Sequence, residues 1–205
     1  AVRKRFDLEP YFAEIDRGAP YEHPIAMQFL TNGPQAHWQT IEQAFIKACS
    51  IAHEEILVQT PYFLPPEGLL MSLCSAALRG VHVSVMLPER GDSYLTQRAS
   101  DSYLTQLLQA GVDVRRYRGG FLHSKLLVVD RRIVGIGSAN MDFRSLEINL
   151  EVMSFVYDKR IAEELSEAFE EDLKECHQLT LEEWSERSFW IRSLEALARL
   201  FSPLL

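Results

Sequence analysis

The sequence has few cysteines and no long apolar stretch. Cys49, Cys74 and Cys176 are far apart, and no CxxC or Cys/His spacing typical of a zinc site is present. We therefore expect reduced thiols in a cytosolic environment, with no metal and no other cofactor. No run approaches ~18 consecutive apolar residues, so we predict no transmembrane segment in this chain.

The chain also lacks an initiator methionine and the apolar region of a signal peptide at its start. We expect it to be part of a longer protein. Proline and glycine residues interrupt any periodicity in residues 1–24, which we predict to be an irregular linker segment.

Basic residues are outnumbered, since 21 Lys and Arg face 29 Asp and Glu and give a net charge of −8. Non-specific binding to nucleic acid depends on neutralising phosphates with Lys and Arg, so we expect no nucleic-acid partner. The 47% hydrophobic and 24% charged residues are an ordinary globular balance, and 205 residues suffice for one sizeable core.

After residue 24, the patterns of strands and helices alternate. Strands are predicted at 25–31, 55–60, 81–87, 112–117, 125–130, 133–136 and 148–157, and helices at 37–53, 67–79, 93–110, 159–175 and 180–201. Asp130-Arg131-Arg132 joins two of these strands as a hairpin. This order predicts an α/β fold, a mixed β-sheet with helices on both faces, followed by a separate helical tail over 179–205.

Four polar residues are spaced for chemistry on a phosphodiester. His123 and Lys125 are two apart where a strand begins, and Ser138 and Asn140 are two apart just after the next strand. If these strands pair, the four side chains converge. Histidine is a suitable nucleophile, Lys125 offsets charge on the phosphate oxygens, and Ser138 and Asn140 donate hydrogen bonds to them.

A nucleophilic histidine needs an acceptor on its second ring nitrogen. Asp130 follows Lys125 by five positions, which favours the opposite face and a structural role. Glu151 shares a predicted strand face with Asn149 and Met153 and is the better partner for His123.

The pattern HxKxxxxDxxxxxxGSxN is complete from His123 to Asn140 and resembles that of the phospholipase D superfamily. Other stretches are similar to bacterial cardiolipin synthases: Gln59–Phe63 with Pro65, Arg79–Val81, Asp92-Ser93, Ala110–Val112, Gly119–Leu122, Asn140–Asp142, Arg144-Ser145 and Phe201–Leu205. The resemblance covers residues 25–205 and implies that 25–178 is the C-terminal, phospholipase D-like catalytic half-domain of such an enzyme.

By this resemblance, a phosphohistidine intermediate carries a phosphatidyl group, and two phosphatidylglycerol molecules give cardiolipin and glycerol at the cytoplasmic face of a bacterial membrane. The motif assigns catalysis to His123, Lys125, Asp130 and Glu151, and phosphate binding to Lys125, Ser138 and Asn140.

Members of the superfamily use two HxK motifs per active site, and this chain has one. We expect the second half-domain in the same longer chain, or else in a homodimer mate. The alternatives are a phospholipase D-type hydrolase, a homodimeric single-motif nuclease, and a domain that binds lipid phosphate without turnover.

Two apolar segments suit either a membrane or the protein core. One segment is Tyr62, Phe63 and Leu64, which follow a strand. For these residues we favour neither contact with a membrane nor packing under the loop over the other. In the tail, a stripe of Trp190, Ile191, Leu194, Leu197, Ala198 and Phe201 is flanked by Arg187, Arg192 and Arg199. This suits an interfacial helix on anionic lipid, but we favour docking of the stripe onto the domain.

Overall fold

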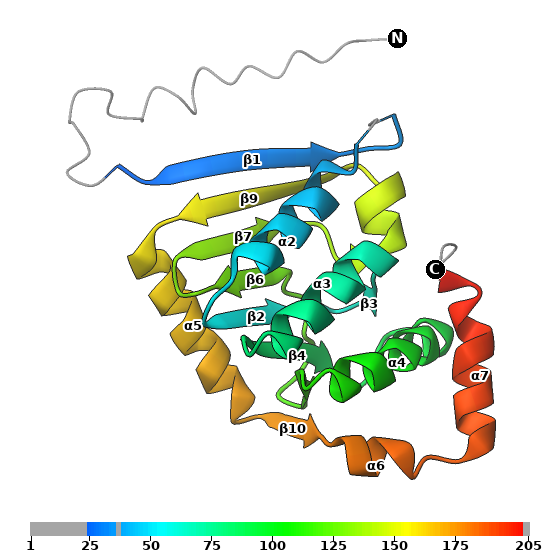
Figure 1. Cartoon of the computed structure of the whole chain (residues 1–205). Helices are drawn as coiled ribbons and strands as arrows, with labels where there is room; N and C mark the ends of the chain where they lie inside the picture. Colours follow the sequence, from blue (N-terminus) through cyan, green and yellow to red (C-terminus); the bar gives the residue numbers. More distant parts are fainter. Residues whose placement is uncertain (1–23, 36–37, 203–205) are drawn as a thin grey trace.

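A computed structural model describes residues 24–35 and 38–202 and contains an eight-stranded sheet over that part of the chain (Figure 1). The strand order is β1-β9-β7-β6-β2-β4-β5-β10. The strands are β1 Ala26–Asn32, β2 Glu55–Gln59, β4 His82–Pro88, β5 Asp113–Tyr117, β6 Leu126–Val129, β7 Ile133–Gly137, β9 Glu151–Tyr157 and β10 Cys176–Leu179. Because β2, β4 and β5 are parallel and all other pairs antiparallel, the predicted mixed sheet is confirmed.

Helices cover both faces of this sheet, as predicted. Alternate residues of β2 face opposite ways, so that Ile56 and Val58 join one core cluster and Leu57 the other. The first cluster includes residues of α2 (Thr40–Ile51), α3 (Glu67–Leu78) and α4 (Tyr94–Gln109). The second is covered by α5 (Lys159–Leu173) through the buried residues Ala162 and Phe169.

The predicted hairpin joins β6 to β7. Asp130 and Arg131 both have positive φ, at 50° and 49°, and Arg132 donates its backbone N–H to the Val129 carbonyl. This is the type I′ turn that suits the twist of an antiparallel pair. The turn holds the Asp130 carboxylate at the end of β6 that is farther from Lys125.

The secondary structure differs from the prediction at several places, among them β9 and β10. Residues Arg144–Ile148 form a π-helical turn, η1, so β9 begins at Glu151 and not at residue 148. The Asp142 carboxylate accepts a hydrogen bond from the Ser145 backbone N–H, which favours the turn over an extended strand. The edge strand β10 was missed, because its four residues do not alternate between polar and apolar types.

The segment after β2 packs inside the protein. Phe63 and Leu64 form β3, which pairs with β8 (Met141–Asp142), and both side chains are buried. The Tyr62 hydroxyl donates to the Asp92 carboxylate, and this hydrogen bond, with burial, raises the pKa of Tyr62 to about 12. Of the two alternatives for this segment, the structure shows the one in which it joins the core.

The tail packs against α4 through α6 (Leu181–Ser185) and α7 (Phe189–Arg199). Leu179, Trp184 and Ala198 belong to the main core cluster, so the tail is less separate than its sequence suggests. Docking of the apolar stripe was wrong for most of its members. Of that stripe only Ala198 is buried, and Trp190, Ile191, Leu194, Leu197 and Phe201 are exposed.

The predicted linker segment, residues 1–24, lies outside the described residues except for its last position. The division between a catalytic half-domain, residues 25–178, and a tail, residues 179–205, stays a prediction.

Candidate active half-site

The half-site lies where three adjacent strands of the sheet begin or end. Lys125 directly precedes β6, Ser138 directly follows β7, and Glu151 is the first residue of β9. Because each strand is antiparallel to the next, these ends meet at one edge, as the pairs Leu126–Ile136 and Gly137–Met153 show. The structure therefore brings the predicted polar residues to the same edge of the sheet.

His123 and Lys125 are in direct contact. The Lys125 ammonium donates to the His123 backbone carbonyl at 2.8 Å and lies 3.1 Å from Nδ1 of the imidazole. On its flat side the ring stacks on Phe121, with centroids 5.4 Å apart and planes 14° from parallel. No described residue hydrogen-bonds Nε2, and the histidine is exposed, so this nitrogen is open to a substrate.

Glu151 is fixed by two neighbours other than His123. One carboxylate oxygen accepts from the Ser138 hydroxyl, and the other accepts from the Asn149 amide at 3.2 Å. Among the hydrogen bonds of the described residues there is none between Glu151 and His123, the pair that we expected. The reason is that Lys125 occupies the Nδ1 side of the imidazole, while Ser138 and Asn149 take the carboxylate oxygens.

The charge of Lys125 is set by opposing effects. Burial lowers the pKa of its ammonium, and the negative charges of Glu151 and Asp142 raise it, with a net lowering. The two carboxylates therefore offset part of the cost of burying a cation at this edge. Glu151 thus acts on the half-site through Lys125 and Ser138.

Ser138 is held by the backbone of β9. Its hydroxyl oxygen accepts from the Val152 N–H at 3.0 Å, and the Ser138 N–H donates to the Val152 carbonyl at 2.9 Å. The preceding residue must be glycine for this close approach. A Cβ on Gly137 would overlap the Val152 carbonyl oxygen and the Met153 backbone.

Asn140 and Asp142 lie next to these groups. The Asn140 amide lowers the pKa of the neighbouring Asp142, while among the described residues the buried Asn140 Oδ1 has no hydrogen-bond partner. Burial raises the pKa of Asp142, although the hydrogen bonds from Ser145 and Asn140 oppose the rise. The sequence assigned no role to Asp142.

Gln59 and Asp172 were also missed by sequence reasoning. The Ser124 hydroxyl, between His123 and Lys125 in the chain, donates to Oε1 of Gln59 at 2.8 Å. The Gln59 amide in turn donates to Asp172 of α5 at 2.6 Å. Gln59 is a buried polar side chain at the end of the apolar strand EILVQ, and that contrast was the available signal.

Asp130, which the motif placed in catalysis, is bound at the other end of β6 from Lys125. Its carboxylate accepts from three backbone N–H groups, those of His53, Glu54 and Glu55, at 2.8 to 2.9 Å. These bonds join the β6–β7 turn to the start of β2, at the far end of β6 from Lys125. These contacts are typical of a structural residue, the role that the spacing from Lys125 favoured, and this role stays a prediction.

Within the described residues, no group of three or more His, Cys, Asp and Glu is arranged to hold a metal ion.

The sequence was compared with known protein families. Residues 45–173, which contain every half-site residue named above, match the family described as "Cardiolipin synthase, PLD-like domain". The chain belongs to this family. The cardiolipin synthase of Listeria welshimeri is 43% identical over 201 residues, covering 98% of this chain and 41% of that protein. The major cardiolipin synthase of Bacillus subtilis is 43% identical over 181 residues, 88% of this chain and 38% of that protein.

The chain spans about two fifths of the length of these curated relatives. Solved structures share its fold. A phosphatidylserine synthase of Haemophilus influenzae matches with a TM-score of 0.68 and 16% identity, over 88% of this chain and 48% of that one. The phospholipase D family member Nuc of Salmonella typhimurium matches with a TM-score of 0.65 and 19% identity, over 77% of this chain and 99% of its own. Among the described residues, no helix has the length and apolar character to span a bilayer.

Proposed function

We propose that this chain supplies one of two HxK half-sites of a phosphatidyltransferase that converts two phosphatidylglycerol molecules into cardiolipin and glycerol. The observation that carries the proposal is the contact of Lys125 with His123 beside the Ser138–Glu151 pair, in a chain of the cardiolipin synthase family. The chain contains one such motif and two fifths of its relatives' length, which supports a site completed elsewhere.

In the proposed first step, a histidine nitrogen attacks the phosphorus of phosphatidylglycerol. A P–N bond forms, the P–O bond to the headgroup glycerol breaks, and the histidine of the other half-site protonates the leaving glycerol. In the second step, the terminal hydroxyl of another phosphatidylglycerol attacks the phosphohistidine and gives its proton to that second histidine. The P–N bond breaks, cardiolipin leaves, and both histidines return to their starting states.

His123 has the exposed Nε2 that either histidine role needs. Lys125 would place its positive charge against the non-bridging oxygens, which gain negative charge in the transition state. Asn140 would donate to the same oxygens, and so would Ser138 once its hydroxyl proton turns from Glu151 toward the phosphate. Glu151 would keep the Ser138 hydroxyl in place and favour the charged form of Lys125.

An uncovered part of the sheet supports a partner beside the half-site. Phe29, Ile136 and Val152 are exposed, with Phe29 at 68%, and the strand registers put them on one face. This is the face that α5 covers farther along, over β6 and β7. We propose that the second HxK half-domain, in the same longer chain or in a homodimer mate, covers this patch and completes the site.

A phospholipid substrate places the assembled enzyme at a membrane surface, which we propose is the cytoplasmic face of the bacterial cell membrane. The sequence-based alternatives predict different products. A hydrolase would release phosphatidic acid, and a homodimeric nuclease would cleave DNA.

The test uses the assembled enzyme, in which this chain is joined to a second HxK half-domain, with vesicles containing phosphatidylglycerol. His123→Ala and Lys125→Ala should each lower cardiolipin formation by at least about a thousandfold, since they remove a reacting or charge-stabilising group. His82→Ala is the matched control, because His82 is exposed at the start of β4, where the strand is farthest from the half-site. Full activity of His123→Ala, or phosphatidic acid as the only product, would refute the proposal.

A further inference from the structure

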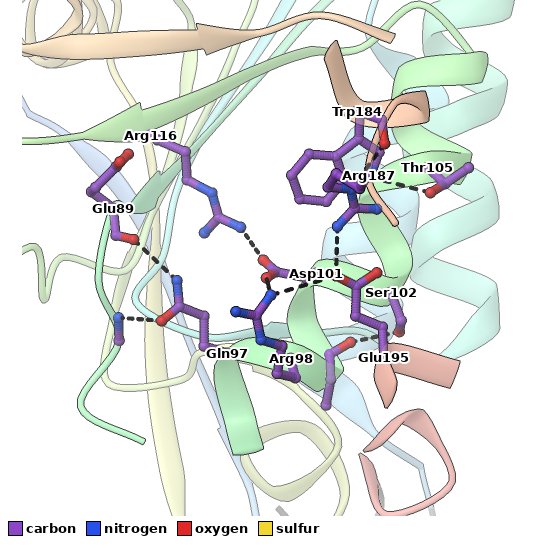
Figure 2. A network of polar contacts seen from close by, with 12 residues as sticks. Glu89, Gln97, Arg98, Asp101, Ser102, Thr105, Arg116, Trp184, Arg187 and Glu195 are labelled. Atoms are coloured by element: carbon purple, nitrogen blue, oxygen red, sulfur yellow. Dashed lines mark hydrogen bonds and ion pairs between the residues drawn. The ribbon is translucent and has the colours of Figure 1, made fainter. Parts of the chain in front are cut away.

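Helix α7 is attached to the protein by its charged side. Figure 2 shows Arg187 bound to Glu195, and Arg98 between Glu195 and Asp101 at 3.7 and 3.6 Å. Asp101 also pairs with Arg116 of β5. Glu195 is only 3% exposed and Asp101 only 5%, so these ion pairs lie between α7 and α4 and not at the surface.

The outward side of α7 and the turn after it carries no charge. Trp190 is 80% exposed and Leu200 74%, and the full set of exposed large apolar residues is Phe189, Trp190, Ile191, Leu194, Leu197, Leu200 and Phe201. A surface helix of a soluble protein normally shows the reverse arrangement, with apolar residues inward and charged residues outward. An exposed apolar surface of this kind marks an interaction site.

Arginines border this apolar side. Arg192, Glu195 and Arg199 follow one another at helical spacing and so form one row along α7, next to the apolar side. A pocket of about 340 Å³ between α4, α6 and α7 is lined by Arg187, Arg192 and Arg199 together with the hydroxyl residues Ser102, Thr105 and Ser185. Within the described residues Arg192 and Arg199 form no ion pair, and Arg199 lies over the Tyr103 ring at 4.1 Å.

We infer that α7 is an interfacial helix that binds the surface of an anionic phospholipid bilayer. Its apolar side enters the boundary between headgroups and acyl chains, and Arg192 and Arg199 bind lipid phosphates. The charge favours this occupant, because two unpaired cations stand beside the apolar side in a chain of net charge −8. A second copy of this chain bound to the same helix would place its own Arg192 and Arg199 beside those of the first, and like charges would repel.

This inference deepens the proposed function, because it says how the chain meets the bilayer that holds its substrate. In Figure 1, β2 runs toward the side of the molecule where α7 lies. Strand β7 runs in the same direction as β2, because both are antiparallel to β6, and β7 ends at the half-site. Binding by α7 needs none of the half-site residues. Vesicle binding and turnover can therefore fail separately.

The test is flotation of the 205-residue chain with vesicles of phosphatidylcholine alone or mixed with phosphatidylglycerol. We expect binding to the mixed vesicles only. Arg192→Gln with Arg199→Gln should weaken it about 25-fold, at roughly fivefold for each arginine near an anionic surface. Trp190→Ser with Leu197→Ser should weaken it at least about tenfold by removing apolar area from the bilayer.

Matched controls are Leu78→Ser, which changes a similarly exposed leucine on α3, and Arg132→Gln, which removes an exposed arginine from the β6–β7 turn. Both should bind vesicles as the unaltered chain does, and so should His123→Ala. Circular dichroism and the melting temperature check that the α7 variants are folded. Equal binding by folded α7 variants would overturn the inference. So would variants that lower the mass of the assembled enzyme, because the helix would then be a protein interface.

Discussion

Asp130→Asn isolates the structural role of a residue that the motif would place in catalysis. Asparagine tolerates the positive φ of 50° at this position, so the turn itself is not strained. The substitution replaces one carboxylate oxygen by an NH₂ group that faces backbone donors. The remaining oxygen can still accept from Glu54 and Glu55, as one carboxylate oxygen does now, so the N–H of His53 loses its acceptor.

The expected cost follows from those three bonds. Hydrogen bonds to a charged group contribute about 1.5–3 kcal/mol each when buried, but these lie partly in solvent, where water replaces a lost acceptor. About 1 kcal/mol for the bond from His53 that is lost, and about 0.5 kcal/mol for each of the two bonds that now meet a neutral acceptor, give a destabilisation of about 2 kcal/mol. For a chain of this size, that corresponds to a melting temperature lower by about 4–8 °C.

The pH dependence gives a second readout. Burial alone would raise the pKa of Asp130, but the three backbone N–H groups outweigh it and hold the pKa below its usual value. A lowered folded-state pKa stabilises the fold above the unfolded value, near 4, and this contribution is lost as the pH falls through the folded value. Asp130→Asn should therefore remove part of the loss of stability below about pH 4.

Thermal melts of the chain at pH 7 and over pH 2–5, beside turnover of the assembled enzyme at a temperature where the variant is folded, test this reasoning. We expect the lower melting temperature with turnover within about threefold of the unaltered enzyme. An unchanged melting temperature with turnover lost more than a hundredfold would refute the structural role.

Three further predictions concern residues that position the half-site or α7. Gln59→Leu removes the acceptor of the Ser124 hydroxyl. Turnover of the assembled enzyme should therefore fall at least about tenfold, while KM for phosphatidylglycerol stays within about threefold. Unchanged turnover contradicts a positioning role for Gln59. Gly137→Ala forces a methyl group against the β9 backbone and should lower stability in denaturant melts by about 1–3 kcal/mol, whereas a neutral result contradicts the close approach. Glu195→Ala leaves Arg187 without an acidic partner at the α4–α7 contact, while Arg98 keeps Asp101, and should cost about 3–5 kcal/mol with faster proteolysis after Arg187. Protection equal to that of the unaltered chain contradicts the attachment of α7 by ion pairs.

The alternation of strands and helices, and the edge of the sheet where the polar residues of the motif lie together, followed from the sequence because both rest on local periodicity. His123 and Lys125 lie at the start of one strand, and Ser138 follows the next strand. Such residues come to the same edge when the two strands pair as an antiparallel hairpin. The position of Asp130 away from Lys125 also followed, since their odd spacing favours the opposite face or the end of the strand.

Contacts between distant parts of the chain were beyond the sequence. The acceptor for Ser124 is 65 residues away at Gln59, and no pattern near His123 indicates it. The hydrogen bonds of Glu151 with Ser138 and Asn149 were not predicted, because strand parity gives the side of a carboxylate but not which neighbours reach it.

The orientation of α7 failed for a related reason. Its apolar stripe predicts burial whenever a core is available. The buried ion pairs of Glu195, which involve residues from α4 and from the α6–α7 connection, turn the opposite side of the helix inward.

The measurement that tests the half-site most directly is cardiolipin formation by the 205-residue chain as a monomer, compared with the same chain joined to a second HxK half-domain. Size-exclusion mass confirms the monomer, and both samples receive the same phosphatidylglycerol vesicles. The account predicts no turnover from the monomer, cardiolipin from the joined enzyme, and loss of that activity in His123→Ala. Cardiolipin produced by the monomer at a rate near that of the joined enzyme would contradict it.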